Sequence, residues 1–420
     1  MKNKKIFLVL SCILVESIAT VCALNAEPYL FTAYPQLKTS IPHIPLCDLP
    51  TPIIKLQAFG DFVGCKNIYM KRDDLTGKKN NRDNLSGKNT DSSFRLYGGN
   101  KPRKLEFLLA DAVQHNAKTI ITYGCAGSNH ALATAVYAHE LGLPSILMLK
   151  NQPNSYVVRQ NLLLDTYYGA QLQFFPDNIT RDRAADQLLQ LDQSAYRIPT
   201  GGSNAIGALG FVNAGLELAA QITSGEIAEP DVIYVASGSC GTTAGLLLGI
   251  KAAHLKSKLV AVCVEPEEEK DEFLVKIKNL FVQTNQILHT LDKTFPVLEF
   301  PEADLIINKK FCGTEYGLYT PEAAAAIKLF EKLEDITLEG TYSAKPIAAI
   351  MDDALHGCYA SHENTTRGDA VHGDIRNKTI LIWNTYCGID YSRLIDGADY
   401  KQLPAAFHRY FEEDVQPLAR

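Results

Sequence analysis

The alternation of short β-branched runs with helical patterns after residue 100 constrains the fold more than any other feature. The runs are rich in Ile, Thr, Val and Leu, and the helical patterns between them end at glycines. The order is strand, helix, strand, helix, strand, over residues 119–123, 130–141, 145–149, 155–168 and 171–175. Such alternation predicts a parallel sheet, because each helix returns the chain to the same edge of the sheet.

A second unit of the same kind follows later in the chain. Residues 231–236 predict a strand, residues 243–254 a helix and residues 259–264 another strand. With 420 residues, of which 46% are hydrophobic, the chain can build more than one core. We therefore expect an α/β protein with two doubly wound, parallel-sheet domains. The net charge of −6 gives no indication of a nucleic-acid partner.

The N-terminus has the pattern of a secretory signal. Lysines at positions 2, 4 and 5 precede an apolar stretch, and small residues at 21–23 suit a signal peptidase. We expect residues 1–23 to be a signal peptide and the protein to be exported, to the periplasm or outside the cell. An uncleaved membrane anchor is the alternative, and residues 9–12 resemble a lipidation box. Beyond this segment no apolar run reaches the length of a membrane span.

A ten-residue repeat precedes the first glycine-rich motif. Residues 71–78, KRDDLTGK, are echoed by residues 81–88, NRDNLSGK. We interpret residues 75–95 as a solvated polar loop insertion lengthened by a local duplication; a lid or a cation-binding loop is the alternative. The cysteines form no CxxC pair and the histidines are scattered, so no metal site is expected and disulfide pairing stays open.

Lys101 is the first candidate for chemistry. It follows Gly98-Gly99-Asn100 at the start of a helical pattern, with Arg103 and Lys104 beside it. Like charges and partial desolvation lower the pKa of a lysine, which a Schiff-base lysine needs in order to act as an amine. A basic helix start on the surface is the competing interpretation.

Two strand-to-helix loops are candidate anion sites. In the first, residues 124–130, free N–H groups at the helix start suit a substrate carboxylate, with Ser128, Asn129 and His130 beside them. Ser128 also suits a plain N-cap, and both roles can hold at once. The second loop, residues 237–242, suits a phosphate, although a tight turn would need the same residues. A lysine, a carboxylate loop and a phosphate loop together fit a pyridoxal 5′-phosphate site.

The motifs also resemble a known family. In the same order they resemble the 1-aminocyclopropane-1-carboxylate (ACC) deaminase / D-cysteine desulfhydrase family of fold-type II pyridoxal-phosphate enzymes, over about residues 45–395. The matching segments are residues 98–106, 124–130, 198–203, 237–245, 315–318, 341–345 and 384–388. The resemblance implies a cofactor cleft between a small domain, residues 104–212, and a large domain, residues 24–103 and 213–420. It also implies a homodimer and a small amino-acid substrate.

The resemblance assigns roles to individual residues. Lys101 matches the lysine that binds the cofactor covalently, Ser128 the active-site nucleophile or base, and Asn129 the partner of the pyridoxal 3′-oxygen. Tyr316 and Tyr342 match the two tyrosines that face the substrate. The phosphate would be held by Lys104, Gly238, Ser239, Cys240, Gly241 and Thr242. Cys240 replaces the usual glycine, so its side chain must point away from the phosphate.

The two branches of the family differ around the pyridine nitrogen. ACC deaminases carry Glu and Leu where this chain has Ser343 and Thr385. Hydroxyls leave the nitrogen largely neutral, which suffices when thiolate is the leaving group. The resemblance therefore implies a lyase that converts D-cysteine to sulfide, pyruvate and ammonia. The alternatives are an ACC deaminase that gives 2-oxobutyrate and ammonia, an exported solute-binding protein and a degenerate enzyme.

Overall fold

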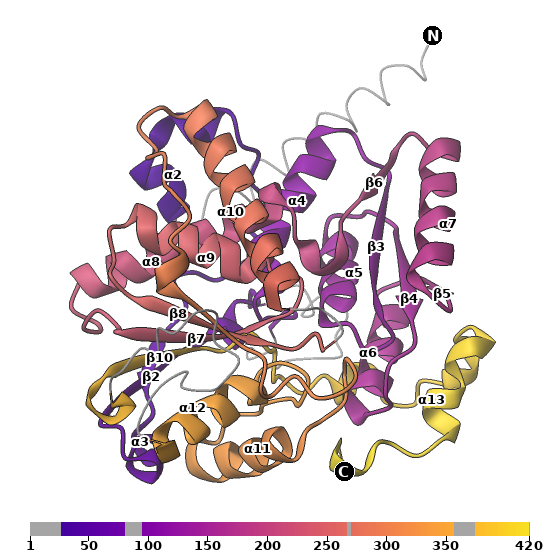
Figure 1. The fold of residues 1–420 in the computed structure, drawn as a ribbon. Helices are drawn as coiled ribbons and strands as arrows, with labels where there is room; N and C mark the ends of the chain where they lie inside the picture. Colours follow the sequence, from indigo (N-terminus) through magenta and orange to yellow (C-terminus); the bar gives the residue numbers. More distant parts are fainter. Residues whose placement is uncertain (1–26, 80–94, 267–269, 357–373, 420) are drawn as a thin grey trace.

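The computed structural model describes residues 27–79, 95–266, 270–356 and 374–419. Within these residues the chain forms two parallel-rich sheets, each covered by helices (Figure 1). This confirms the α/β class with two doubly wound sheets. Each strand and helix expected from the sequence begins and ends within two residues of its expected limits. The expected signal peptide and most of the duplicated insertion lie outside the described residues.

The larger sheet has six strands, and five of them run parallel. The edge strand β1 pairs antiparallel with β2. In spatial order the strands are β1 (Ile53–Lys55), β2 (Asn67–Lys71), β10 (Thr379–Trp383), β7 (Val232–Ser237), β8 (Lys258–Cys263) and β9 (Leu305–Asn308). The central strand β7 is buried along its whole length, as the apolar run at 231–236 suggested.

Helices cover both faces of this sheet (Figure 1). Successive side chains of β7 point to opposite faces of the sheet, so this strand contributes to two hydrophobic cores. Ile233 and Val235 pack beneath one set of helices, and Val232 and Tyr234 pack beneath the other. The first set is α2 (Tyr29–Ala33), α8 (Ala205–Thr223), α9 (Gly241–Ala252) and α10 (Lys270–Leu291), and the second is α3 (Gln57–Val63), α11 (Pro321–Glu334) and α12 (Ala344–His356).

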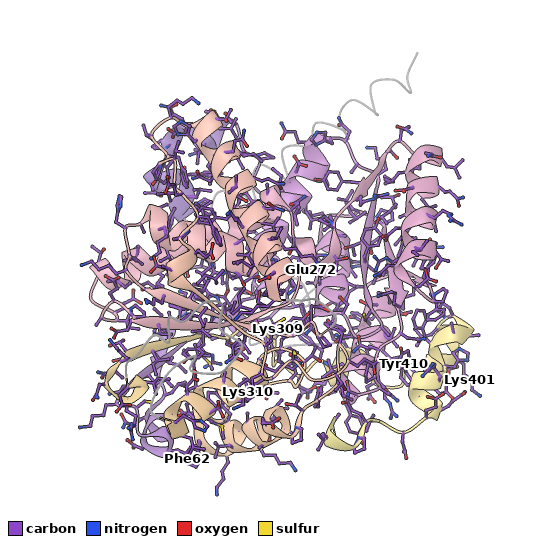
Figure 2. The ribbon with its side chains drawn as sticks, viewed as in Figure 1. Phe62, Glu272, Lys309, Lys310, Lys401 and Tyr410 are labelled. Atoms are coloured by element: carbon purple, nitrogen blue, oxygen red, sulfur yellow. The ribbon has the colours of Figure 1, made fainter. Side chains whose placement is uncertain are left out.

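The smaller sheet has four parallel strands in the order β5 (Gln171–Phe174), β4 (Ser145–Lys150), β3 (Thr119–Cys125) and β6 (Ala195–Arg197). One face is covered by α4 (Lys101–Gln114), α5 (Asn129–Glu140) and α6 (Tyr156–Tyr167), and the other by α7 (Asn178–Leu191). The C-terminal helix α13 (Arg409–Glu412) returns to this sheet, where Tyr410 points into the smaller lobe (Figure 2) and accepts a hydrogen bond from the backbone N–H of Gln152 at 3.1 Å.

Helix α8 runs unbroken across residue 212, where the resemblance places a domain limit. It packs closely on α9, since a Cβ added at Gly215 would lie 2.7 Å from the carbonyl carbon of Gly249. Among the described residues α8 is also the one helix long and apolar enough to span a bilayer, although Glu217 and Asn213 interrupt its apolar run. Because 78% of its apolar stretch is buried inside the fold, α8 serves as a core helix.

The solvated-loop interpretation needs correction at residues 75–78. Thr76 and Gly77 are buried, and Gly77 forms an antiparallel bridge with Cys47. The Thr76 hydroxyl donates to the carbonyl of Gly99 at 2.8 Å, so this polar group is satisfied inside the fold. A polar composition therefore concealed a buried segment, because its polar side chains find partners within the chain. Residues 80–94 lie outside the described residues.

Candidate active site

A cleft of about 690 Å³ lies at the carboxyl ends of the parallel strands. The loops after β3 and β7 both enter it, as open α/β sheets commonly arrange their ligand sites. The residues expected from the sequence that line it are Lys101, Ser128, Asn129, His130, Gly238, Ser239, Cys240, Thr242, Tyr316 and Tyr342. The structure thus brings together residues that are more than 200 positions apart in the chain.

Lys101 is the first residue of α4. Its Nζ donates to Oδ1 of Asn100 at 2.9 Å and lies 5.5 Å from the centre of the Tyr342 ring. Burial lowers the pKa of Lys101 to about 8, although the carboxylate of Glu339 opposes the shift. The amine is therefore neutral in a useful fraction of molecules near neutral pH, as a nucleophilic lysine requires.

Asn100 lies inside the GGNK motif, and its role becomes visible only in the fold. Its Nδ2 donates to the Thr242 hydroxyl at 3.0 Å, and its backbone N–H donates to the Thr385 carbonyl at 3.1 Å. Asn100 therefore ties the Lys101 turn both to the loop after β7 and to the segment after β10.

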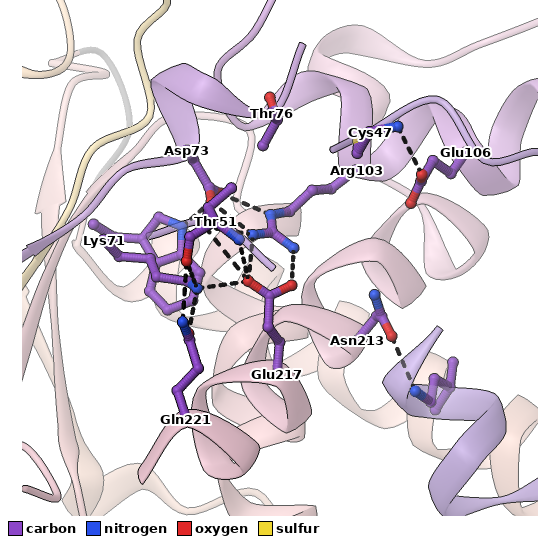
Figure 3. A network of polar contacts seen from close by, with 12 residues as sticks. Cys47, Thr51, Lys71, Asp73, Thr76, Arg103, Glu106, Asn213, Glu217 and Gln221 are labelled. Carbon is purple, nitrogen blue, oxygen red and sulfur yellow. Dashed lines mark hydrogen bonds and ion pairs between the residues drawn. The ribbon is translucent and has the colours of Figure 1, made fainter. Parts of the chain in front are cut away.

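Arg103 does not belong to the lysine cluster, contrary to the expectation from sequence. It forms ion pairs with Asp73 at 2.7 Å and with Glu217 at 2.9 Å, and all three side chains are fully buried (Figure 3). Successive residues of an α-helix turn by ~100°, so Arg103 faces away from Lys101 while Lys104 returns to the same side. Burial, and not a neighbouring arginine, lowers the Lys101 pKa.

Lys104 helps to form a cradle for an anion, together with the segment after β6 (Gly201 and Ser203) and the loop after β7 (Ser239 and Gly241). Its Nζ donates to the Gly201 carbonyl at 3.0 Å and to the Ser203 hydroxyl at 3.2 Å. The Ser203 hydroxyl in turn lies 2.8 Å from that of Ser239 and accepts from the Gly241 N–H at 3.1 Å. Burial, followed by the charge of Lys101, lowers the pKa of Lys104 well below its usual value. An anion bound here would stabilise the charged form of Lys104.

Glycine is required at two positions of this cradle. A Cβ at Gly201 would lie 2.0 Å from the Ser239 hydroxyl, and one at Gly241 would lie 2.5 Å from the Ser203 hydroxyl. Cys240 adopts a left-handed φ of 68°, and its side chain packs in the core beside α9. Ser203 lies within residues 198–203, one of the segments that carry the resemblance, but its place in the cradle is visible only in the fold.

The loop after β3 presents hydrogen-bond donors. The Ser128 hydroxyl caps α5 by accepting from the Ala131 N–H at 3.2 Å, so the expected N-cap is present. The amide oxygen of Asn129 accepts from the Tyr97 hydroxyl at 2.9 Å and from Asn161 Nδ2 at 3.1 Å. The Asn129 NH₂ is therefore the end available to an acceptor such as the ring oxygen.

His130 lines the cleft as a neutral imidazole. Its Nε2 lies 2.9 Å from the Thr122 hydroxyl, which itself donates to the Ile198 carbonyl at 3.0 Å, so Nε2 carries the proton. Burial, reinforced by Lys101 and Lys104, lowers the pKa of His130 well below its usual value. His130 therefore supplies no positive charge for a substrate carboxylate.

Tyr316 and Tyr342 form a hydrogen-bonded pair on the cleft wall, with their hydroxyl oxygens 2.8 Å apart. Burial is the main cause that raises the pKa of both phenols well above the usual value. Both hydroxyls therefore keep their protons near neutral pH and can act as hydrogen-bond or proton donors.

Ser343 and Thr385 have different surroundings. The Ser343 hydroxyl accepts from the Glu339 N–H at 2.8 Å, and the Glu339 carboxylate accepts from the N–H groups of Thr341 and Ser343 at 2.8 and 3.1 Å. The Thr385 hydroxyl is buried and has no hydrogen-bond partner among the described residues. A buried polar group without a partner is costly, so the Thr385 hydroxyl is suited to a bound ligand.

The arrangement fits pyridoxal phosphate. It combines an amine of lowered pKa, an anion cradle closed by a second lysine, and a buried hydroxyl for which the described part of the chain offers no hydrogen-bond partner. Across the described ranges, no group of three His, Cys, Asp or Glu side chains could hold a metal ion. The fold and this site define a pyridoxal-phosphate enzyme of fold type II.

Comparison with known proteins agrees with this class. The family model "Pyridoxal-phosphate dependent enzyme" matches residues 91–364, and the chain belongs to this family, within its ACC deaminase / D-cysteine desulfhydrase group. D-cysteine desulfhydrase of Yersinia pestis (strain Pestoides F) is 35% identical over 326 residues, which cover 76% of this chain and 89% of the relative. D-cysteine desulfhydrase of Serratia proteamaculans (strain 568) is 33% identical over 325 residues, with 76% and 89% covered.

Solved structures of other proteins share the fold of this chain. The crystal structure of an ACC deaminase homologue superposes with a TM-score of 0.66 at 28% identity, covering 88% of this chain and 99% of the other. The fungal L-serine ammonia-lyase of Rhizomucor miehei superposes with a TM-score of 0.52 at 16% identity, with 86% and 98% covered, and shares the fold alone.

Proposed function

We propose that the protein is a carbon–sulfur lyase that converts D-cysteine to sulfide, pyruvate and ammonia. The observation that carries this proposal is the buried Thr385 hydroxyl, which has no partner among the described residues and matches the position facing the pyridine nitrogen. The buried carboxylate of Glu339, which acts on the pKa of Lys101, is held by backbone N–H groups. A neutral hydroxyl partner leaves the nitrogen largely unprotonated, which is sufficient when the leaving group is a thiolate.

The cofactor would be held by residues from both sheets. Lys101 would bind it covalently, Lys104 and Ser203 with the loop after β7 would hold its phosphate, and Asn129 would donate to its ring oxygen. When bound, it supplies an electron sink that stabilises negative charge at the substrate Cα.

The chain's own residues would move the protons. Lys101, with its lowered pKa, takes the proton from the substrate Cα. Ser128 and the N–H groups at the start of α5 hold the α-carboxylate. Tyr316 donates a proton to the departing sulfur and recovers one through its hydrogen bond with Tyr342.

The alternative is an ACC deaminase, which the similarity to the solved ACC deaminase homologue favours. The two activities give different products, since ring opening of ACC yields 2-oxobutyrate and elimination from D-cysteine yields pyruvate and sulfide. Comparing the two substrates on one preparation separates them.

The primary test is absorption spectroscopy combined with a product assay. The purified protein with added pyridoxal phosphate should show a visible absorption band from the bound cofactor that is missing in Lys101→Ala. It should release equal amounts of pyruvate and sulfide from D-cysteine. A protein that binds the cofactor but releases neither product nor 2-oxobutyrate would be a degenerate enzyme. Failure to bind the cofactor would favour the solute-binding alternative.

We propose in addition that the protein is exported and acts as a homodimer. Export rests on the lysines and apolar stretch of residues 1–23, and dimerisation on the family resemblance. N-terminal sequencing of protein recovered from cell fractions tests the first proposal, and light scattering tests the second. A cytosolic protein with an intact N-terminus, or a monomeric active enzyme, would contradict them.

A further inference from the structure

The reaction above leaves one part of the cleft without a role. This part is lined by side chains of the β4 end, of α7 and of α10, none of which the D-cysteine reaction uses: Lys150, Asn178, Arg181, Lys276, Asn279 and Gln283. Cysteine has a side chain of a single thiol, so it would not reach across to these residues and hold the cofactor at the same time. The remaining polar space indicates a longer substrate.

Arg181 contributes a buried positive charge to this region. It is only 8% exposed, and its guanidinium lies 4.8 Å from the centre of the Tyr123 ring. Its Nε and Nη2 donate to Asp182 at 2.9 and 2.8 Å, and Nη1 has no hydrogen bond within the described residues. A guanidinium held on one edge and left available on the other is preorganised for a carboxylate.

The neighbouring side chains are also donors. Lys150 ends β4, and it lines the cleft together with Asn178, the first residue of α7. On α10, Lys276, Asn279 and Gln283 follow at spacings of three and four, so they share one helix face.

Among the described residues, the carboxylates that line the cleft are Glu265 and Glu315, and they lie near the two tyrosines. Glu315 precedes Tyr316 in the chain. A Cβ placed at Gly238 would lie 3.4 Å from Glu265 Oε1 and 3.3 Å from the Tyr342 hydroxyl, so Glu265 lies beside Tyr342. Asp182, the partner of Arg181, is 57% exposed, so water screens its charge. Arg181 therefore keeps enough attraction for an anion in the cleft.

Building on the proposed function, we propose that this region is a subsite for a second acidic group, and that the preferred substrates are S-substituted cysteines whose sulfur substituent ends in a carboxylate. Lysis of such a substrate breaks the Cα–H and Cβ–S bonds. The sulfur leaves as a thiol after gaining a proton, one water is consumed, and pyruvate and ammonia are formed. The acidic end would contact Arg181 Nη1.

The test compares three substrates on the holoenzyme: D-cysteine, S-(2-carboxyethyl)-D-cysteine and the neutral S-propyl-D-cysteine. We expect kcat/KM for the carboxyethyl compound to exceed that for the propyl compound at least tenfold. Arg181→Gln should abolish this preference and leave turnover of D-cysteine within about twofold of the unmodified enzyme.

Arg197→Gln is the matched control. Arg197 also lies over the Tyr123 ring, at 6.0 Å, and also pairs with an aspartate, but it does not line the cleft. It should keep the preference for the carboxyethyl compound. Equal loss in both arginine variants, or no preference in the unmodified enzyme, would overturn the subsite.

A binding measurement separates this proposal from the proposed function. If no cysteine derivative is turned over, the lyase proposal fails while the subsite is still testable by calorimetry with D-glutamate and D-norvaline. Tighter binding of D-glutamate that is lost in Arg181→Gln would support the subsite. Equal affinity for the two compounds would overturn it.

Discussion

Two groups of charged side chains lie on opposite sides of the first turn of α4, and they are built in opposite ways. On one side Arg103 and Lys71 face Asp73 and Glu217, so two positive and two negative charges are buried together (Figure 3). On the other side Lys101 and Lys104 form no ion pair within the described residues; they contact amide, carbonyl and hydroxyl groups. Charge balanced within the chain supports the fold, whereas charge left unbalanced in a desolvated cleft is available to a ligand.

The pKa values show the same contrast. Burial acts to raise the pKa of Glu217, but Arg103 and Lys71 overcome it and hold the pKa at about 2. Burial lowers the pKa of Lys101 to about 8, and the more distant Glu339 only partly compensates. Glu217 is therefore charged at neutral pH, while Lys101 is poised between its two forms. Four experiments test this contrast, beginning with the one for which the largest effect is expected.

The largest effect is expected for Lys101→Ala, which should lower pyruvate formation at least ~10³-fold, because Lys101 would both bind the cofactor covalently and move the Cα proton. Lys101→Arg is the control: it keeps the charge and loses the nucleophilic amine, and it should be equally inactive. Steady-state assays and the visible spectrum measure the result. An active Lys101→Arg enzyme would show that only the charge matters.

Glu217→Gln should destabilise the protein by ~3–5 kcal/mol at pH 7, because it leaves Arg103 and Lys71 with one carboxylate fewer in a buried site. Since the pKa of Glu217 is about 2 in the fold and 4.5 in the unfolded chain, its contribution is complete above pH 4.5 and is lost as pH falls toward 2. Denaturant unfolding of both proteins at several pH values measures the gap. A gap that does not narrow below pH 4.5 would contradict the ion-pair account.

Lys101→Met should stabilise the cofactor-free protein by ~2 kcal/mol at pH 7, since it removes a charge that burial penalises. Because the folded pKa of about 8 lies below the unfolded value of 10.5, the penalty is complete below pH 8 and fades as pH rises toward 10.5. Thermal unfolding across this range checks the trend. A destabilised Lys101→Met protein would show that Lys101 contributes to the fold as Arg103 does.

The variants Thr385→Val and Ser343→Ala test whether the Thr385 hydroxyl binds a ligand and whether the Ser343 hydroxyl stabilises the fold. Thr385→Val removes a hydroxyl without a partner among the described residues, so stability should hold while kcat falls about tenfold, or ~1.4 kcal/mol. Ser343→Ala removes the acceptor of the Glu339 N–H and should cost ~1 kcal/mol of stability with a smaller effect on kcat. Urea denaturation and initial rates measure both, and the reverse pattern would exchange the two roles.

Local sequence patterns were enough for much of the fold and part of the site. The strands and helices of both α/β units, the helix start at Lys101 and the loops after β3 and β7 follow from periodicity, glycines and capping residues. The hydrogen-bond and ion-pair partners of these groups did not follow from the sequence. Arg103 was grouped with the lysines although it pairs with Asp73 and Glu217, and Thr76 and Gly77 were expected in solvent although they are buried.

The order of the elements and the residue types that carry chemistry can be read along the chain, because periodicity and turn chemistry act over a few neighbouring residues. Which polar groups are paired and which are left for a ligand depends on the folded arrangement. Ser203 pairs with Ser239, Asn100 pairs with Thr242, and the Thr385 hydroxyl has no hydrogen-bond partner among the described residues. Pairing depends on distances between groups that lie tens to hundreds of residues apart, and only packing sets those distances.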